Sequence, residues 1–190
     1  MDVSWTTLAG IALGIGLAAA TGFRVFLPLL VAGLAARYGG LGLSEHFQWL
    51  ASTPALVMLG SAALVEVLAY YIPGVDHVLD VLASPATLVA GAVASAAVMT
   101  VLPASVVWPV AIIGGGGIAG LTKGSSALLR AKSGVMTGGL GNPVVATAET
   151  VGATGLSLFA IALPFIALLA IVLLLAWVVR KTGKLLFGRK

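Results

Sequence analysis

Long uncharged runs dominate the pattern of hydrophobic and polar positions along this chain. The 42 residues from Val81 to Thr122 contain no charged side chain, and a second uncharged run covers the 30 residues from Thr150 to Val179. A soluble domain needs charged residues on its surface, whereas a helix that crosses a membrane takes about 20 mostly apolar residues. The pattern therefore predicts an integral membrane protein with several transmembrane helices.

Six apolar segments follow one another, and two of them have unusual lengths. The segments cover residues 4–21, 25–36, 53–72, 83–102, 104–121 and 143–179. The segment 25–36 makes about 18 Å of helix, less than a hydrocarbon core of about 30 Å. The segment 143–179 contains Pro164 and is long enough for two crossings or one kinked helix. Such segments are typical of re-entrant or broken helices. We therefore expect an all-α membrane protein with about six transmembrane helices and two short re-entrant helices, at 22–40 and 123–141.

A weak internal similarity indicates two repeat units within a single membrane domain, 1–190. The units cover 4–73 and 104–163, with a linking helix at 83–102 and a basic tail at 180–190. In each unit a helix begins with a polar residue followed by proline, Thr53-Pro54 in the first and Asn142-Pro143 in the second, which is typical of an N-cap and first turn. Chance can also produce this similarity, because the spacing from the proline to the next glutamate differs between the units.

The distribution of basic residues favours one topology. If 22–40 and 123–141 are re-entrant and the chain turns back near Pro164, eight basic residues lie on one side of the membrane and two on the other. If 25–36 crosses instead and the last segment crosses once, the counts are six and four. Cytoplasmic loops carry an excess of Lys and Arg, which favours the first arrangement. It makes the two units inverted and predicts a multi-pass protein of the inner (plasma) membrane with both termini in the cytoplasm.

Composition agrees with a membrane protein and excludes some chemistry. Of the 190 residues 60% are hydrophobic and 8% are charged, whereas roughly 25% are charged in soluble domains. Cysteine is absent, which excludes disulfides and thiolate metal sites. Five of the ten basic residues lie in the last eleven positions, which is more typical of a cytoplasmic flank beside anionic lipid than of a nucleic-acid site. We expect no nucleic-acid partner and no cofactor.

Two lone carboxylates, Glu66 and Glu149, lie in helices otherwise built mainly from small and aliphatic residues. A charged residue near the centre of a membrane helix costs about 2.5–3.5 kcal/mol, so both should face protein or a water-filled cavity. They can be a protonatable or cation-binding pair on a pathway, or structural partners that tie the re-entrant segments to the helices. Arg24 and Arg130 are the cations beside these segments. The Arg24 guanidinium can hold an anionic head group through paired donors, or extend to the membrane interface.

A short polar cluster, Asp76, His77 and Asp80, lies between two apolar segments. The two carboxylates are four residues apart and share one helical face, and with an imidazole they suit Zn or Mn in ligand type. The pattern is more typical of a solvated loop helix with an acidic first turn. A metal site here remains the second interpretation.

Three stretches of this sequence together resemble a known family. They are Gly22 to Leu30 (GFRVFLPLL), Pro73 to His77 (PGVDH) and Thr137 to Pro143 (TGGLGNP). Their residues and their order resemble the bacterial membrane family catalogued as domain of unknown function 4126, over roughly residues 10–155. The resemblance implies a small multi-pass membrane protein, and it implies no activity.

We therefore expect a small membrane transporter or flippase for an ion, a small anion or a lipid-linked head group, with proton coupling as one option. The pathway residues would be Glu66, Glu149, Arg24, Arg130, Thr53 and Asn142, since these are the strong polar groups at depth and at the helix starts. The alternative is a non-transporting accessory subunit of a larger membrane complex, with the glutamates in structural roles. Catalytic clusters at depth are sparse, so we do not expect an enzyme. The lipid bilayer is the expected partner, together with further copies of the chain or a larger complex.

Overall fold

The computed structural model describes residues 4–72 and 74–187, and its regular elements within these ranges are all helical. The α-helices are α1 (Trp5–Thr21), α2 (Leu27–Tyr38), α3 (Thr53–Ala69), α4 (Val75–Ala97), α5 (Ala104–Val110), α6 (Gly117–Thr137), α7 (Asn142–Ala162) and α8 (Pro164–Phe187). A 3₁₀-helix, η1 (Glu45–Ala51), precedes α3, and a π-helical stretch, η2 (Ala111–Gly116), joins α5 to α6. The predicted all-α class is confirmed.

Three helical stretches of the described chain are long and apolar enough to cross a membrane. They are Val78–Ala97, Ala104–Thr137 and Asn142–Ala162. A fourth arises if η1 and α3, which meet at 67°, form one bent span. The helices α1, α2 and the Pro164–Trp177 part of α8 are apolar but shorter. The chain thus has the apolar helices of a membrane protein, but the predicted number of about six spans is not confirmed.

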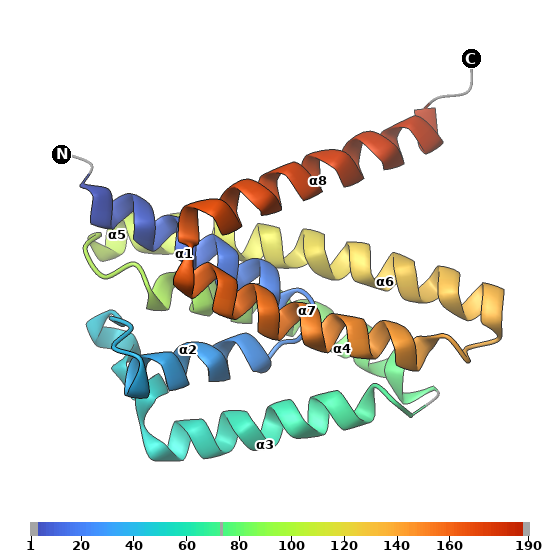
Figure 1. Cartoon of the computed structure of the whole chain (residues 1–190), viewed down its shortest axis with the longest axis horizontal. Coiled ribbons are helices and arrows are strands. Elements are labelled where there is room, and N and C mark those ends of the chain that lie inside the picture. Colours follow the sequence, from blue (N-terminus) through green and yellow to red (C-terminus); the bar gives the residue numbers. More distant parts are fainter. Residues whose placement is uncertain (1–3, 73, 188–190) are drawn as a thin grey trace.

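The chain reverses direction between α1 and α2, near the middle of the bundle (Figure 1). These helices have 17 and 12 residues, so they are about 25 and 18 Å long. Their connecting turn lies against α6. Gly22 permits this contact, because a Cβ at this position would lie 2.4 Å from the Cβ of Thr122 and 2.6 Å from the carbonyl oxygen of Ala119. The turn thereby brings Arg24 into the bundle interior, where its side chain is fully buried.

Helix α1 is surrounded by other helices, and small residues allow their close approach. It contacts α4, α6, α7 and α8. A Cβ on Gly14 would lie 2.9 Å from the carbonyl oxygen of Ser95 in α4, and one on Gly16 would lie 2.5 Å from the Cβ of Ala160 in α7. Close backbone approach through small residues is typical of helix packing in membranes. It gives the polar groups near the end of α1 a fixed position relative to these neighbouring helices.

The predicted re-entrant helix at 123–141 is wrong. The elements α5, η2 and α6 form one helical stretch from Ala104 to Thr137, and the segment starts within it. Lys123 and Arg130 do not interrupt this helix, because both are buried against acidic side chains of other helices. In Figure 1, α1 and α6 run in the same direction, so an inverted relation between the units 4–73 and 104–163 is not supported.

The predicted turn near Pro164 is confirmed. Helix α7 ends at Ala162, α8 begins at Pro164, and α8 runs back in the opposite direction (Figure 1). Proline ends a helix readily because it has no N–H to donate and its ring clashes with the preceding turn. Helix α8 therefore ends at Phe187, at the opposite end of the bundle from Trp5 (Figure 1). This arrangement does not support the prediction that both termini lie on the same side.

Candidate functional site

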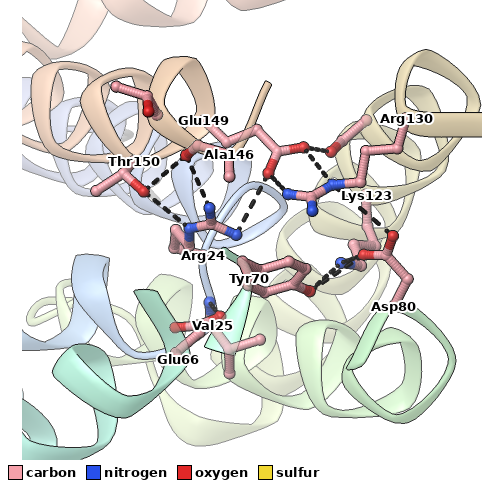
Figure 2. Close-up of polar contacts among 12 residues, drawn as sticks. Arg24, Val25, Glu66, Tyr70, Asp80, Lys123, Arg130, Ala146, Glu149 and Thr150 are labelled. Atoms are coloured by element: carbon pink, nitrogen blue, oxygen red, sulfur yellow. Dashed lines mark hydrogen bonds and ion pairs between the residues drawn. The ribbon is translucent and has the colours of Figure 1, made fainter. Parts of the chain in front are cut away.

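Arg24 extends from the turn between α1 and α2 to a single turn of α7. Its Nε donates to Thr150 Oγ1 at 3.0 Å and its Nη2 donates to the carbonyl oxygen of Ala146 at 2.8 Å. Its Nη1 lies 3.3 Å from Glu149 Oε2. Figure 2 shows these contacts side by side on α7. The planar guanidinium, with donors in a fixed fork, thus attaches the turn to this helix.

Glu149 lies between two arginines. Besides Arg24, its carboxylate contacts Arg130 of α6, whose Nε donates to Oε1 at 3.1 Å and whose Nη2 donates to Oε2. Ser126, one turn earlier in α6, also donates to Oε1. Arg130 Nε lies in addition 3.7 Å from Asp80 Oδ2 in α4. One carboxylate therefore connects α7 with α6 and with the turn after α1.

Tyr70, at the end of α3, lies among the three cations of this region. Its hydroxyl donates to Asp80 Oδ1 at 3.1 Å and accepts from Lys123 Nζ at 2.9 Å, and Lys123 Nζ also donates to Asp80 Oδ1 at 2.7 Å. The Cζ atoms of Arg24 and Arg130 each lie 4.1 Å from the centroid of its ring, a cation–π distance. We call this set the ion-pair cluster (Figure 2): Arg24, Tyr70, Asp80, Lys123, Arg130 and Glu149.

Glu66 is next to this cluster but has a different role in the fold. Its Oε1 accepts from the backbone N–H of Val25 at 2.7 Å and its Oε2 accepts from that of Phe26 at 3.1 Å. These two N–H groups lie at the start of α2, where the helix dipole is positive and the first amides have no partner within the helix. The carboxylate of α3 therefore caps α2, and this side chain, like Arg24, holds the turn in place.

Asp76 and Asn142 join the start of α4 to the start of α7. Asn142 Nδ2 donates to Asp76 Oδ2 at 2.7 Å, and Asp76 Oδ1 accepts from the N–H of Gly74 at 2.9 Å. Asn142 is the first residue of α7, and Gly141 occupies the N-cap position. The prediction that Asn142 caps the helix is therefore wrong, because its side chain bonds across to α4 instead.

Thr53 is not part of this site. It lies in the first turn of α3 and accepts a hydrogen bond from Arg37 Nη1 at 2.7 Å, whereas Ser52 is the cap, since its Oγ accepts from the N–H of Ala55 at 3.3 Å. The start of α3 and the start of α7 lie at opposite ends of the bundle (Figure 1). The structure thus separates Thr53 and Asn142, which were expected to act together.

The predicted metal site is not supported. Asp80 pairs with Lys123, and Asp76 pairs with Asn142, so the two carboxylates have different partners. Among the described residues, no group of three His, Cys, Asp or Glu side chains lies close enough together to hold a metal ion. The side chain of His77 lies outside the described residues.

Three cavities border the ion-pair cluster. The first, of about 260 Å³, is lined by Tyr70, Tyr71, Gly74, Asp76, Gly134, Gly138, Gly139, Asn142 and Pro143. The second, of about 470 Å³, lies between α3, α4 and the turn after α1, and its polar lining residues are Ser61, Glu66 and Tyr70. The third, of about 530 Å³, lies between α4 and α6 and reaches Asp80 and Arg130. The cluster is therefore buried but has open space on several sides.

The structure places Arg24, Arg130 and Glu149 in direct contact, while two members of the cluster were missed from the sequence. These members are Lys123 and Tyr70, neither of which was singled out from the sequence. A signal was present, because Lys123 and Arg130 are seven residues apart and so share one helical face. That face could have been matched to a buried acidic partner, although the identity of the partner depends on the fold.

Comparison with known proteins gives a family and nothing more specific. The sequence model of one family, with the description "Domain of unknown function (DUF4126)", matches residues 11–184. No curated protein and no solved structure gives a significant match.

Proposed function

The chain belongs to this family of unknown function, DUF4126, and from the ion-pair cluster we propose that it is a small multi-pass membrane transporter for an anionic substrate, an ion or a lipid-linked head group. One observation carries the proposal. Arg24 and Arg130 share the Glu149 carboxylate, which Arg24 approaches through its Nη1 at 3.3 Å, and Arg130 retains a buried Nη1 without a hydrogen-bond partner among the described residues. A substrate anion that displaces the Glu149 carboxylate would bind to two guanidinium groups that the fold already positions. Such exchange of an internal carboxylate for a substrate oxyanion is a direct way to couple binding to movement.

Energetics support a role beyond stability. Replacing a buried ion pair by well-packed apolar residues is often neutral or stabilising by about 1–4 kcal/mol, because desolvation of the charges offsets their attraction. Intramembrane charges are expensive and typical of ion or substrate pathways. A cluster with three cations therefore needs a reason other than stability, and the adjoining cavities give it access to a ligand.

We also propose an orientation for the bundle. The end that holds the α3–α4 and α6–α7 turns also receives the basic end of α8, with Arg180, Lys181 and Lys184, whereas Arg37 lies at the other end. The excess of basic residues favours the cytoplasm for the first end. In this orientation α1 and α2 form a re-entrant hairpin that enters from the opposite side, since neither is long enough to cross unaided. The N-terminal end of α1 then lies outside.

The proposal is tested with purified protein in liposomes. The probes are radiolabelled inorganic phosphate inside the vesicles and fluorescently labelled phosphatidic acid in the bilayer. We expect the wild-type protein to move at least one of them, and Glu149→Gln to reduce the rate at least tenfold, because the neutral amide leaves the two arginines without their shared anion. Glu45→Gln is the matched control, since Glu45 is an exposed residue of η1 away from the cluster.

The second candidate is a non-transporting accessory subunit. It is favoured by the fact that Glu149, Asp80 and Glu66 all have partners already, as structural ion pairs and caps would. Absence of movement of both probes, together with a stoichiometric partner in the purified material, would replace the transporter proposal by this one. Equal rates in Glu149→Gln and wild type would remove Glu149 from the mechanism.

A further inference from the structure

Exposed aromatic side chains gather at one end of the bundle. Three of the four tryptophans and one of the three tyrosines are the first residue of α1, the last residue of α2, and residues of η1 and α5. The start of α1, the end of α2, the start of α3 and α5 share one end of the bundle, at the left in Figure 1. Tryptophan is highly buried on average in soluble proteins, so this end suits an environment other than water. We call the four residues the aromatic belt: Trp5, Tyr38, Trp49 and Trp108, with exposed fractions of 72%, 76%, 49% and 44%.

The helix η1 lies across this end of the bundle and not along it. It meets α3 at 67°, and α3 runs along the longest axis of the bundle (Figure 1). Side chains three positions apart share one side of a 3₁₀-helix. Phe47 and Leu50 share the buried side, Glu45 and Gln48 share an exposed polar side, and Trp49 lies on the remaining exposed side. An amphipathic helix that lies near the membrane plane is typical of the interface between water and hydrocarbon.

Direct contacts fix the belt to the long apolar helices. The N–H of Ser44, which precedes η1, donates at 2.8 Å to the carbonyl oxygen of the last residue of α4. The ring centroids of Phe47 and Trp108 lie 6.2 Å apart, which joins η1 to α5. The ring centroid of Trp5 lies 4.6 Å from that of Phe165 in the first turn of α8. The belt therefore has a fixed position along the axis of the bundle.

We infer that the aromatic belt binds the boundary between the phospholipid head groups and the acyl chains. Indole and phenol rings suit this boundary, because each has an apolar body and one polar N–H or O–H group. The belt is distributed over four elements, as contact with a continuous lipid boundary requires, whereas a partner protein on one side would cover only some of them. In the orientation proposed above, this boundary is at the extracytoplasmic face. The lipid contact itself does not depend on the proposed transport.

The belt sets the depth of the ion-pair cluster. Helix α1 has 17 residues from Trp5 to Thr21 and is about 25 Å long, and Arg24 lies in the turn that follows. The hydrocarbon core is about 30 Å thick. A helix that starts at the belt therefore brings Arg24 past the middle of the bilayer, toward the opposite interface. Tyr71, next to Tyr70 of the cluster, is 41% exposed and would be an anchor at that second interface.

Quenching of tryptophan fluorescence by brominated phosphatidylcholine measures the depth of each ring. Trp5→Phe, Trp108→Phe and Trp177→Phe together leave Trp49 as the single tryptophan of the full-length chain. The protein is reconstituted in bilayers whose lipid bromines lie either near the ester groups (shallow) or near the chain ends (deep). We expect the shallow bromines to quench Trp49 about twofold more strongly than the deep ones, because an interfacial ring lies at head-group level. The variants that retain only Trp5 or only Trp108 should show the same preference.

Leu64→Trp, in a chain without other tryptophans, is the matched control. Leu64 is 60% exposed in the middle of α3, so the new ring does not disturb the core. The deep bromines should quench this ring more strongly than the shallow ones. The same preference for Trp49 and for Leu64→Trp would contradict a lipid boundary at η1. Quenching of Trp49 by aqueous iodide alone would place the belt in water, and resistance to all quenchers would mean that a protein, such as a second copy of the chain, covers it. Either result would overturn the inference.

Tyr71→Trp, in the same chain without other tryptophans, tests the depth of the cluster separately. We expect the shallow bromines to quench this ring more strongly, as they should at a second interface. A preference for the deep bromines here, with Trp49 still shallow, would place the cluster near the centre of the bilayer. That result would overturn the depth and leave the belt. The transport proposal is decided independently, by the movement of phosphate and phosphatidic acid in liposomes.

Discussion

At the scale of the residue, Tyr70 stabilises the cluster in two separable ways, through its hydroxyl and through its ring. Tyr70→Phe removes the bonds to Asp80 and Lys123 but keeps the ring beside two guanidinium groups. We expect a loss of about 1 kcal/mol for the hydroxyl. Tyr70→Leu should cost about 1–3 kcal/mol more, since both cation–π contacts are lost in a desolvated site. Thermal unfolding in detergent measures both variants, and equal stability of Tyr70→Phe and Tyr70→Leu would exclude a role for the ring.

The sequence could indicate single residues of this site but not their pairing. Glu149 and Arg24 are conspicuous because a charge beside an apolar run must find a partner. Tyr70 is not conspicuous, since tyrosine is common at membrane interfaces and its contact with two arginines depends on three helices. Lys123 was hidden for a similar reason, because its partner Asp80 is 43 positions away.

At the scale of the element, the α1–α2 turn depends on close contact with α6. A Cβ on Gly22 would lie 2.4 Å from the Cβ of Thr122. Gly22→Ala should therefore destabilise the protein by about 1–3 kcal/mol, as overpacking does. Gly60→Ala is the control, because nothing lies within 4 Å of a Cβ there, and alanine in a helix interior should be neutral or stabilising by up to about 1 kcal/mol. Thermal unfolding compares the two, and a neutral Gly22→Ala would mean that the turn is not packed against α6.

Elements were predictable where the local sequence decides them. Pro164 made a turn between α7 and α8 one of two alternatives that the sequence left open, because proline cannot continue the hydrogen bonding of the preceding turn. It does not decide the matter alone, since Pro85 and Pro109 lie inside α4 and α5. The continuous helix through segment 123–141 could not be predicted from the sequence. Basic residues within an apolar run usually end a membrane helix, unless they are buried and paired. Arg130 is paired with Glu149, and that contact exists only in the folded bundle.

At the scale of the whole molecule, the re-entrant α1–α2 hairpin that we propose would change the topology that charge counting predicted. The count assumed that the first apolar segment crosses the membrane, which placed the N-terminus with the basic C-terminal end. Two helices that enter and leave on the same side would add no crossing, and in this proposed topology the two ends of the chain lie on opposite faces. The basic residues of α8 and Lys132 of α6 still lie at one end of the bundle, as the positive-inside rule requires.

This topology can be tested directly, because the chain has no cysteine of its own. Single cysteines are placed at three exposed positions: Ser4 before α1, Tyr38 at the end of α2 and Leu140 between α6 and α7. In right-side-out membrane vesicles, a membrane-impermeant maleimide should label Ser4→Cys and Tyr38→Cys. It should reach Leu140→Cys only after the membrane is opened. Protection of Ser4→Cys with labelling of Tyr38→Cys would mean that α1 crosses the membrane by itself. The hairpin would then not be re-entrant, and Arg24 would approach α7 from the other face of the bilayer.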